Sequence, residues 1–90
     1  MQSTNGADRL FSDAEWQRLV SDLGFTSRQA ELIDGILQGW SDQQVARKLQ
    51  ISPHTVRAHL QRVFEAQGVT DRTALVVNIF RRFRQLSIEE

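Results

Sequence analysis

Basic side chains gather without any acidic partner in one stretch of this 90-residue chain, from position 47 to position 62. The stretch contains four cationic residues and two histidines, which are Arg47, Lys48, Arg57, Arg62, His54 and His59. Cationic side chains bind nucleic-acid phosphates by displacing condensed counterions, and an arginine can donate two hydrogen bonds to the edge of a guanine. These residue types therefore favour recognition of a polyanion over catalysis.

Two helices joined by a short turn are predicted to position these side chains. Ser41 and Gln44 have the spacing of a capping box, which begins a short helix. Ser52 then precedes Pro53 at the first position of a second helix, where the missing N–H costs nothing, and Gly68 ends that helix. This order is typical of a helix-turn-helix, a motif whose main use is to place its second helix in the major groove of DNA.

The rest of the chain also shows helical patterns. Ser12 with Glu15 and Thr26 with Gln29 form two further capping boxes, and Asp71 is the expected cap of a last helix. Because apolar residues recur at helical spacing and no long segment alternates, we predict an all-α fold. The predicted divisions are a flexible arm over 1–11, an additional N-terminal helix over 12–24, a four-helix helix-turn-helix bundle over 25–86 and a tail over 87–90.

Aromatic residues are assigned to the core. Phe11 and Trp16 have the spacing of a hydrophobic staple around the first cap. Trp16 and Trp40 are expected as core anchors, since no ligand-binding pattern surrounds either of them. His54 and His59 are five positions apart instead of four and have no accompanying carboxylate, so a helical metal site is not expected.

The composition limits the classes of protein to consider. A chain of 90 residues forms one domain without room for a deep catalytic pocket. It has no cysteine, no apolar stretch of membrane-spanning length, and a polar start, MQSTNG, that is not a signal peptide. We therefore expect a cytoplasmic, non-enzymatic protein without a cofactor, a metal or a small-molecule ligand.

The net charge of zero argues against simple electrostatic binding to DNA. The charge is unevenly distributed, however. Residues 1–46 contain seven acids and three arginines, a balance of −4, whereas residues 47–90 contain eight basic residues and four acids, a balance of +4. The positive half contains the helix-turn-helix pattern, so we expect weak, salt-sensitive binding that depends on a dimer.

From Phe25 to Phe80 the chain resembles the LuxR-type (GerE/FixJ-like) helix-turn-helix family of bacterial transcription regulators. The string Ser52-Pro53-His54-Thr55-Val56-Arg57-Ala58-His59 is the most specific part of the resemblance. Flanking matches are Thr26, Arg28, Gly39-Trp40-Ser41, Val45-Ala46, Leu49, Gly68-Val69, Asp71-Arg72 and Ala74-Leu75-Val76. The resemblance implies sequence-specific binding of double-stranded DNA, with the recognition helix over 53–67 in the major groove.

Helix geometry and the resemblance together assign the contacts. The expected base contacts are Arg57, Ala58 and Gln61, which point outward at helical spacing. The expected phosphate contacts are Thr55, Arg47, Lys48, Arg62 and His54. Thr26, Arg28 and Arg72 are weaker candidates, equally explained by caps or surface ion pairs. The resemblance implies a homodimer through the last helix, at Leu75, Val76, Ile79, Phe80 and Phe83, and the alternative is that this helix only closes the core. RNA polymerase is a possible further partner.

Three departures from the family leave alternatives open. Gln29 replaces the usual glutamate, Ala66-Gln67 replaces the usual Lys-Leu, and Gln50 stands in the turn where a glycine would relieve a positive φ. A protein-interaction module that has lost DNA binding would fit the zero net charge and Ala66-Gln67. A promoter-reading domain like the last domain of sigma factors would share the motif.

Overall fold

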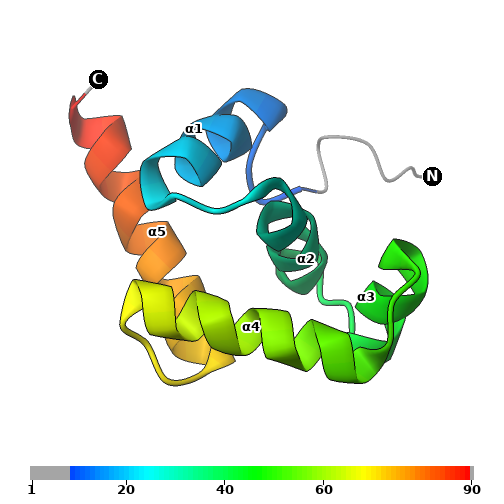
Figure 1. Ribbon diagram of the computed structural model, residues 1–90. Coiled ribbons are helices and arrows are strands. Elements are labelled where there is room, and N and C mark those ends of the chain that lie inside the picture. Colours follow the sequence, from blue (N-terminus) through cyan, green and yellow to red (C-terminus); the bar gives the residue numbers. More distant parts are fainter. Residues whose placement is uncertain (1–8, 90) are drawn as a thin grey trace.

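A computed structural model describes residues 9–89, which form five helices (Figure 1). In chain order they are α1 (Asp13–Leu23), α2 (Ser27–Leu37), α3 (Asp42–Leu49), α4 (Pro53–Gln67) and α5 (Arg72–Glu89). No strand occurs within this described part of the chain. The predicted all-α fold, a helix-turn-helix bundle with one extra N-terminal helix, is confirmed.

Local capping chemistry explains where the helices begin. Ser12, Thr26 and Ser41 each accept a hydrogen bond from the backbone N–H three residues later, and the side chain at that position accepts one in return. At α4, Ser52 accepts from the Thr55 N–H and Pro53 takes the first helical position. The Asp71 carboxylate accepts from the Ala74 N–H at 2.8 Å. These five bonding patterns are the ones that the sequence predicts.

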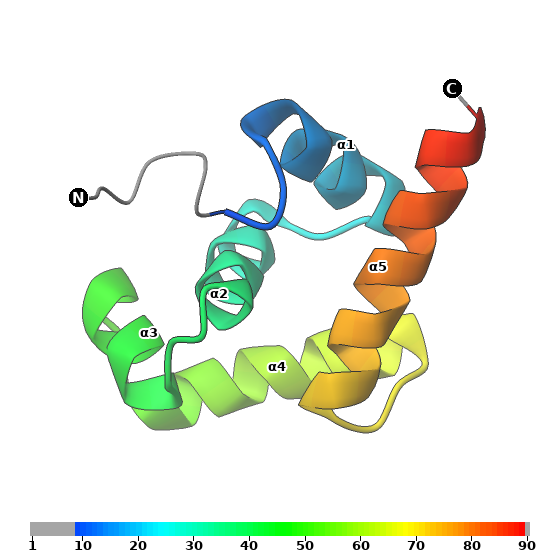
Figure 2. The same cartoon turned by 180° about the vertical axis from the view of Figure 1, so that it is seen from behind.

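Helix α4 forms one side of the molecule (Figure 1). Helix α3 packs against the beginning of α4, α5 crosses its later turns, and α2 lies between α3 and α1. The view from behind shows the same arrangement, with α1 beside the upper part of α5 and on the far side of the molecule from α4 (Figure 2). The core is drawn from all five helices, and its fully buried members are Leu19, Leu32, Ile33, Val45, Val56, Val63, Leu75 and Ile79.

The N-terminal segment is more ordered than the sequence indicates. Phe11 is only 4% exposed, and its ring centroid lies 6.3 Å from that of Trp16, as the predicted staple requires. The same ring contacts Phe80 at 5.1 Å and Phe83 at 4.9 Å, both on α5. The prediction of a flexible arm through residue 11 is therefore wrong at its end, because Phe11 belongs to the core. Residues 1–8 of that predicted arm lie outside the described residues.

The last helix is also longer than predicted. It continues to Glu89 instead of ending near Leu86, so most of the predicted tail over 87–90 is helical, and residue 90 lies outside the described part. An ion pair between Arg82 and Asp22 joins α5 to the last turn of α1. This contact joins parts of the chain that are far apart in the sequence.

A close approach between α2 and the following segment positions α3. A Cβ atom at Gly35 would lie 2.8 Å from the Trp40 ring and 3.1 Å from a Val45 methyl group. Glycine therefore allows the half-buried indole to lie directly on the α2 backbone. Trp16 is 7% exposed and Trp40 packs against the core, so both tryptophans are anchors, as predicted.

Candidate nucleic-acid interface

Helix α4 presents a continuous stripe of exposed side chains. Its inner face is formed by Val56, Leu60 and Val63, each at most 3% exposed. The opposite face carries side chains spaced i, i+3, i+4 and i+7, which are the exposed His54, Arg57, Ala58 and Gln61. All four side chains are exposed, so the described part of the chain leaves this face open. The three predicted base-contact residues therefore share one accessible surface.

The turn before α4 fixes the angle at which this surface is held. Gln50 has φ 60° and ψ 44°, the only positive φ at a non-glycine residue within 9–89. The Ile51 N–H donates to the Ala46 carbonyl at 2.9 Å, which closes the end of α3. The Ser52 and Thr55 hydroxyl oxygens lie 2.9 Å apart, so the predicted phosphate contact Thr55 shares a hydrogen bond with the cap.

Further exposed cations lie on the same two helices, α3 and α4. Arg47 and Lys48 occupy the last turn of α3 and Arg62 lies on α4, all three exposed. None of these three forms an ion pair with another residue of the described chain. Their charges are therefore available to a polyanion, which is the property that the predicted phosphate contacts require.

Most acidic residues of the N-terminal half are paired by arginines away from this surface. Arg9 contacts Asp13 at 3.1 Å and Asp34 at 3.0 Å. Arg28, a weaker phosphate candidate, lies 3.7 Å from Glu31 within α2. These pairs lower the negative field of α1 and α2, which the net charge of zero does not reveal.

One acidic residue does approach the stripe. Asp42, the first residue of α3, lies 2.6 Å from an Nη atom of Arg72 and 3.9 Å from an Nη atom of Arg57. The sequence does not predict this contact, since the three residues come from three helices and no spacing rule connects them. The short distance favours the ion-pair explanation of Arg72 over a phosphate contact.

Gln67, one of the departures from the family, has a structural partner. Its Nε2 donates to the Leu23 carbonyl at 3.0 Å, and its Oε1 accepts from Asn78 at 3.4 Å. The side chain therefore links the end of α4 to the end of α1 and to α5. The amide at this position supports the additional N-terminal helix.

The predicted dimer face needs a correction. Leu75 and Ile79 are 0% exposed within the single chain, so they offer no surface to a second copy. Phe83 is half-buried against Phe11. Helical spacing alone could not separate core-facing from partner-facing positions on a helix rich in apolar residues. The exposed apolar surface of α5 contains Val77 at 43% and Phe80 at 38%, beside the half-buried Val76.

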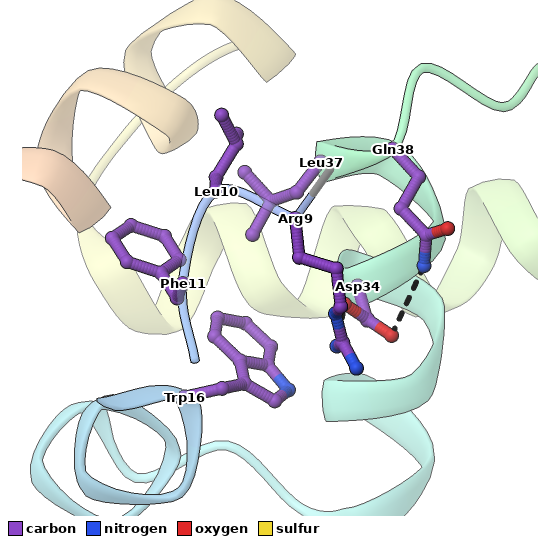
Figure 3. A pocket seen from close by; sticks show the side chains of 7 residues that line it. All are labelled: Arg9, Leu10, Phe11, Trp16, Asp34, Leu37 and Gln38. Atoms are coloured by element: carbon purple, nitrogen blue, oxygen red, sulfur yellow. Dashed lines mark hydrogen bonds and ion pairs between the residues drawn. The ribbon is translucent and has the colours of Figure 1, made fainter. Parts of the chain in front are cut away.

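A hollow beside Trp16 offers no reactive group (Figure 3). Its volume is about 260 Å³, and it lies between the N-terminal segment and α2. The Asp34 carboxylate in its wall accepts from Arg9 at 3.0 Å and from Gln38 at 3.3 Å, so its polar groups satisfy one another. No group of His, Cys, Asp or Glu in the described residues is placed to hold a metal ion, and no described helix is long and apolar enough to cross a membrane.

The comparison with known families agrees with this geometry. The family model of the bacterial regulatory proteins of the luxR family matches residues 23–79, from the end of α1 into α5. The chain belongs to the luxR family. Residues 23–79 therefore form the helix-turn-helix domain of this family, and the predicted resemblance is confirmed. Nearly all of α1 lies outside the matched residues.

Curated relatives support the same assignment. The chain is 37% identical, over 57 residues, to the probable transcriptional regulatory protein NarL of Mycobacterium tuberculosis, in strains CDC 1551 and H37Rv. The match covers 63% of this chain and 26% of either relative. The chain thus spans about a quarter of the length of these curated relatives. No solved structure matches the chain.

Proposed function

We propose that this luxR-family domain regulates transcription by reading double-stranded DNA with the exposed face of α4 in the major groove. The observation that supports it most is the uncovered stripe containing Arg57, Ala58 and Gln61. A helix fits the major groove, where every base pair presents a distinct set of donors, acceptors and methyl groups. The shape, exposure and chemistry of this one face of α4 therefore support recognition of the major groove.

Each side chain of the stripe suits a different contact. Arg57 is 59% exposed and can donate to O6 and N7 of a guanine, while Gln61 can make two hydrogen bonds with adenine N6 and N7. Gln61 makes only a long hydrogen bond of 3.4 Å to Glu65, which is easily exchanged. Ala58 is small enough to let the helix approach the bases closely, and its methyl group can contact a thymine methyl. We assign base reading to these three residues.

Phosphate contacts would determine how deeply α4 enters the major groove and in which direction it lies there. Arg47 and Lys48 extend from the last turn of α3 beside the beginning of α4, and Arg62 lies further along α4. His54 and Thr55 lie in the first turn of α4, where backbone N–H groups face an approaching anion. These five residues would hold the domain on both strands, with little information about sequence.

Dimerisation would place two copies of α4 in successive major grooves. The surface suited to it on α5 contains Val76, Val77 and Phe80, since these apolar side chains are not fully covered within one chain. A two-fold symmetric pair would read two half-sites about 34 Å apart, centre to centre. The acidic α1, on the side opposite α4, would remain accessible to a further partner such as RNA polymerase (Figure 1).

Selection of bound sequences from a random pool of duplex DNA tests this function. We expect enrichment of two inverted half-sites about 10 base pairs apart, centre to centre, each containing a guanine. A single enriched half-site would contradict the dimer but keep the DNA reading. A pool without enrichment, together with no salt-dependent binding at ~50 mM salt, would contradict the function and favour a protein-interaction module. Recovery with RNA polymerase core would favour the sigma-like alternative.

A further inference from the structure

Asp42 holds a carboxylate between arginines from two other helices. Its Oδ1 lies 2.6 Å from Arg72 on α5, and its Oδ2 lies 3.9 Å from Arg57 on α4. The Asp42 side chain is 24% exposed, whereas that of Arg57 is 59% exposed. The carboxylate thus lies beside the guanidinium end of an exposed base-reading side chain.

The capping bonds hold the backbone at Asp42, and one hydrogen bond holds its side chain. Asp42 is the first residue of α3, directly after the cap formed by Ser41 and Gln44, whose mutual hydrogen bonds measure 2.7 and 3.2 Å. The hydrogen bond from Arg72 prevents the side chain from turning away. Arg57 forms no other ion pair and no hydrogen bond through its side chain with a described residue, so no second partner holds its guanidinium away from an approaching DNA.

We propose that Asp42 is a positioning residue that makes the binding of DNA through Arg57 depend on guanine. The proposal rests on the proposed function. A guanidinium has five N–H donors, so Arg57 can bond both guanine acceptors while another edge faces the carboxylate. Where no guanine is present, the Asp42 carboxylate competes with the DNA phosphates for the Arg57 guanidinium. Its negative charge also repels these phosphates. Asp42 therefore suppresses non-specific binding more than specific binding.

The size of the expected effect follows from the geometry. An exposed ion pair contributes at most about fivefold to an equilibrium, and the Arg57–Asp42 distance of 3.9 Å is long for such a pair. A bidentate arginine–guanine contact favours the correct base by about one to two orders of magnitude. The Arg57–guanine contact is therefore strong enough to offset the loss of the Asp42 ion pair. A contact between Arg57 and a phosphate, which salt weakens, contributes much less affinity.

A purely structural role is the alternative explanation for Asp42. The Arg72 ion pair joins α5 to α3, and an acidic residue in the first turn stabilises a helix through its dipole. Asp13 is a matched control, since it is the first residue of α1, follows a capping box, and pairs with Arg9 at 3.1 Å. Asp13→Asn removes the same charge away from the exposed face of α4.

The test is a double-mutant cycle of Asp42→Asn and Arg57→Gln, with Asp13→Asn as control. Fluorescence anisotropy would measure binding to the selected duplex, to the same duplex with the contacted guanine replaced, and to a random duplex. For Asp42→Asn we expect three- to fivefold tighter binding to the random duplex. The plot of log affinity against log salt concentration for this duplex should become steeper by about one unit. Discrimination for guanine should fall about threefold, and Asp13→Asn should leave it unchanged.

The cycle also separates the possible failures. If Asp42 acts through Arg57, Asp42→Asn has no effect on discrimination in the Arg57→Gln background. An effect of the same size in that background, or unchanged discrimination in Asp42→Asn alone, would overturn the proposal while the wild type still binds DNA. Absence of binding by the wild type to every duplex would instead contradict the proposed function. Thermal unfolding of each variant shows whether a change in binding reflects lost folding.

Discussion

Gln50 occupies a backbone conformation that favours glycine. With φ 60° and ψ 44°, it lies in the left-handed region, where a residue with a Cβ atom pays about 1–2 kcal/mol. Because the family resemblance predicts a turn of this shape, the sequence alone indicated the strain. The strained residue lies in the turn between the two helices that carry the candidate DNA contacts, and relief of its strain is measured as a change in stability.

Gln50→Gly should therefore stabilise the domain. Relief of the left-handed strain is partly offset by the greater freedom of glycine in the unfolded chain, which leaves a gain of about 0.5 kcal/mol. Urea unfolding measures the change. Gln85→Gly is the matched control, since Gln85 is an exposed residue within α5, and this substitution should destabilise by about 0.5–1 kcal/mol. Destabilisation by both substitutions would show that the turn is not strained.

Lys48 provides a test of the phosphate contacts. It is exposed, lies in the last turn of α3, and has no ion pair with a described residue. Lys48→Ala should flatten the plot of log affinity against log salt by about one unit on every duplex sequence. Arg84→Ala removes an equally exposed cation from the last turns of α5, far from α4, and should leave the slope unchanged. Equal slope changes would show that only net charge matters.

At the scale of elements, α1 and the segment before it differ most from the sequence-based expectation. The cap at Ser12 was predictable, because capping involves side chains only three residues apart. The contact of Phe11 with α5 was not predictable, since about 70 residues separate the partners and no local pattern encodes the pairing. The same reason explains why Leu75 and Ile79 were assigned to a dimer surface instead of the core.

Phe11→Ala tests whether this segment supports the fold. Phe11 is 4% exposed and contacts Trp16, Phe80 and Phe83, so its loss should lower the free energy of unfolding by about 3 kcal/mol. The neighbouring Leu10 is 56% exposed, and Leu10→Ala should change stability by less than about 0.5 kcal/mol. If urea unfolding shows an equally small loss of unfolding free energy for both variants, Phe11 does not support the fold, and the prediction of a flexible arm through residue 11 would hold.

At the scale of the whole molecule, the arrangement of charge matters more than its sum. The chain has 11 acidic residues and 11 lysines and arginines, yet Arg47, Lys48 and Arg62 remain unpaired within the described chain while several acids of α1 and α2 are paired with arginines. The sequence predicted a positive half from residue counts. It could not predict the pairing, because Arg82 meets Asp22 and Arg72 meets Asp42 only after folding.

The exposure of the candidate site residues could be predicted, because helical periodicity determines it. Arg57, Ala58 and Gln61 share one open face because Val56, Leu60 and Val63 are drawn into the core. The influence of Asp42 on that face was not predictable, since it depends on the angle between α3 and α4. The contacts of these residues with DNA remain predictions.

The most direct measurement compares the wild type with Arg57→Ala on the selected duplex and on all its single-base variants, by fluorescence anisotropy at one salt concentration. The account predicts a loss of about 1–3 kcal/mol on the selected duplex and loss of discrimination at one guanine position only. An equal loss of affinity on every duplex would contradict base reading by Arg57. Arg57 would then contact a phosphate instead of a guanine in the major groove.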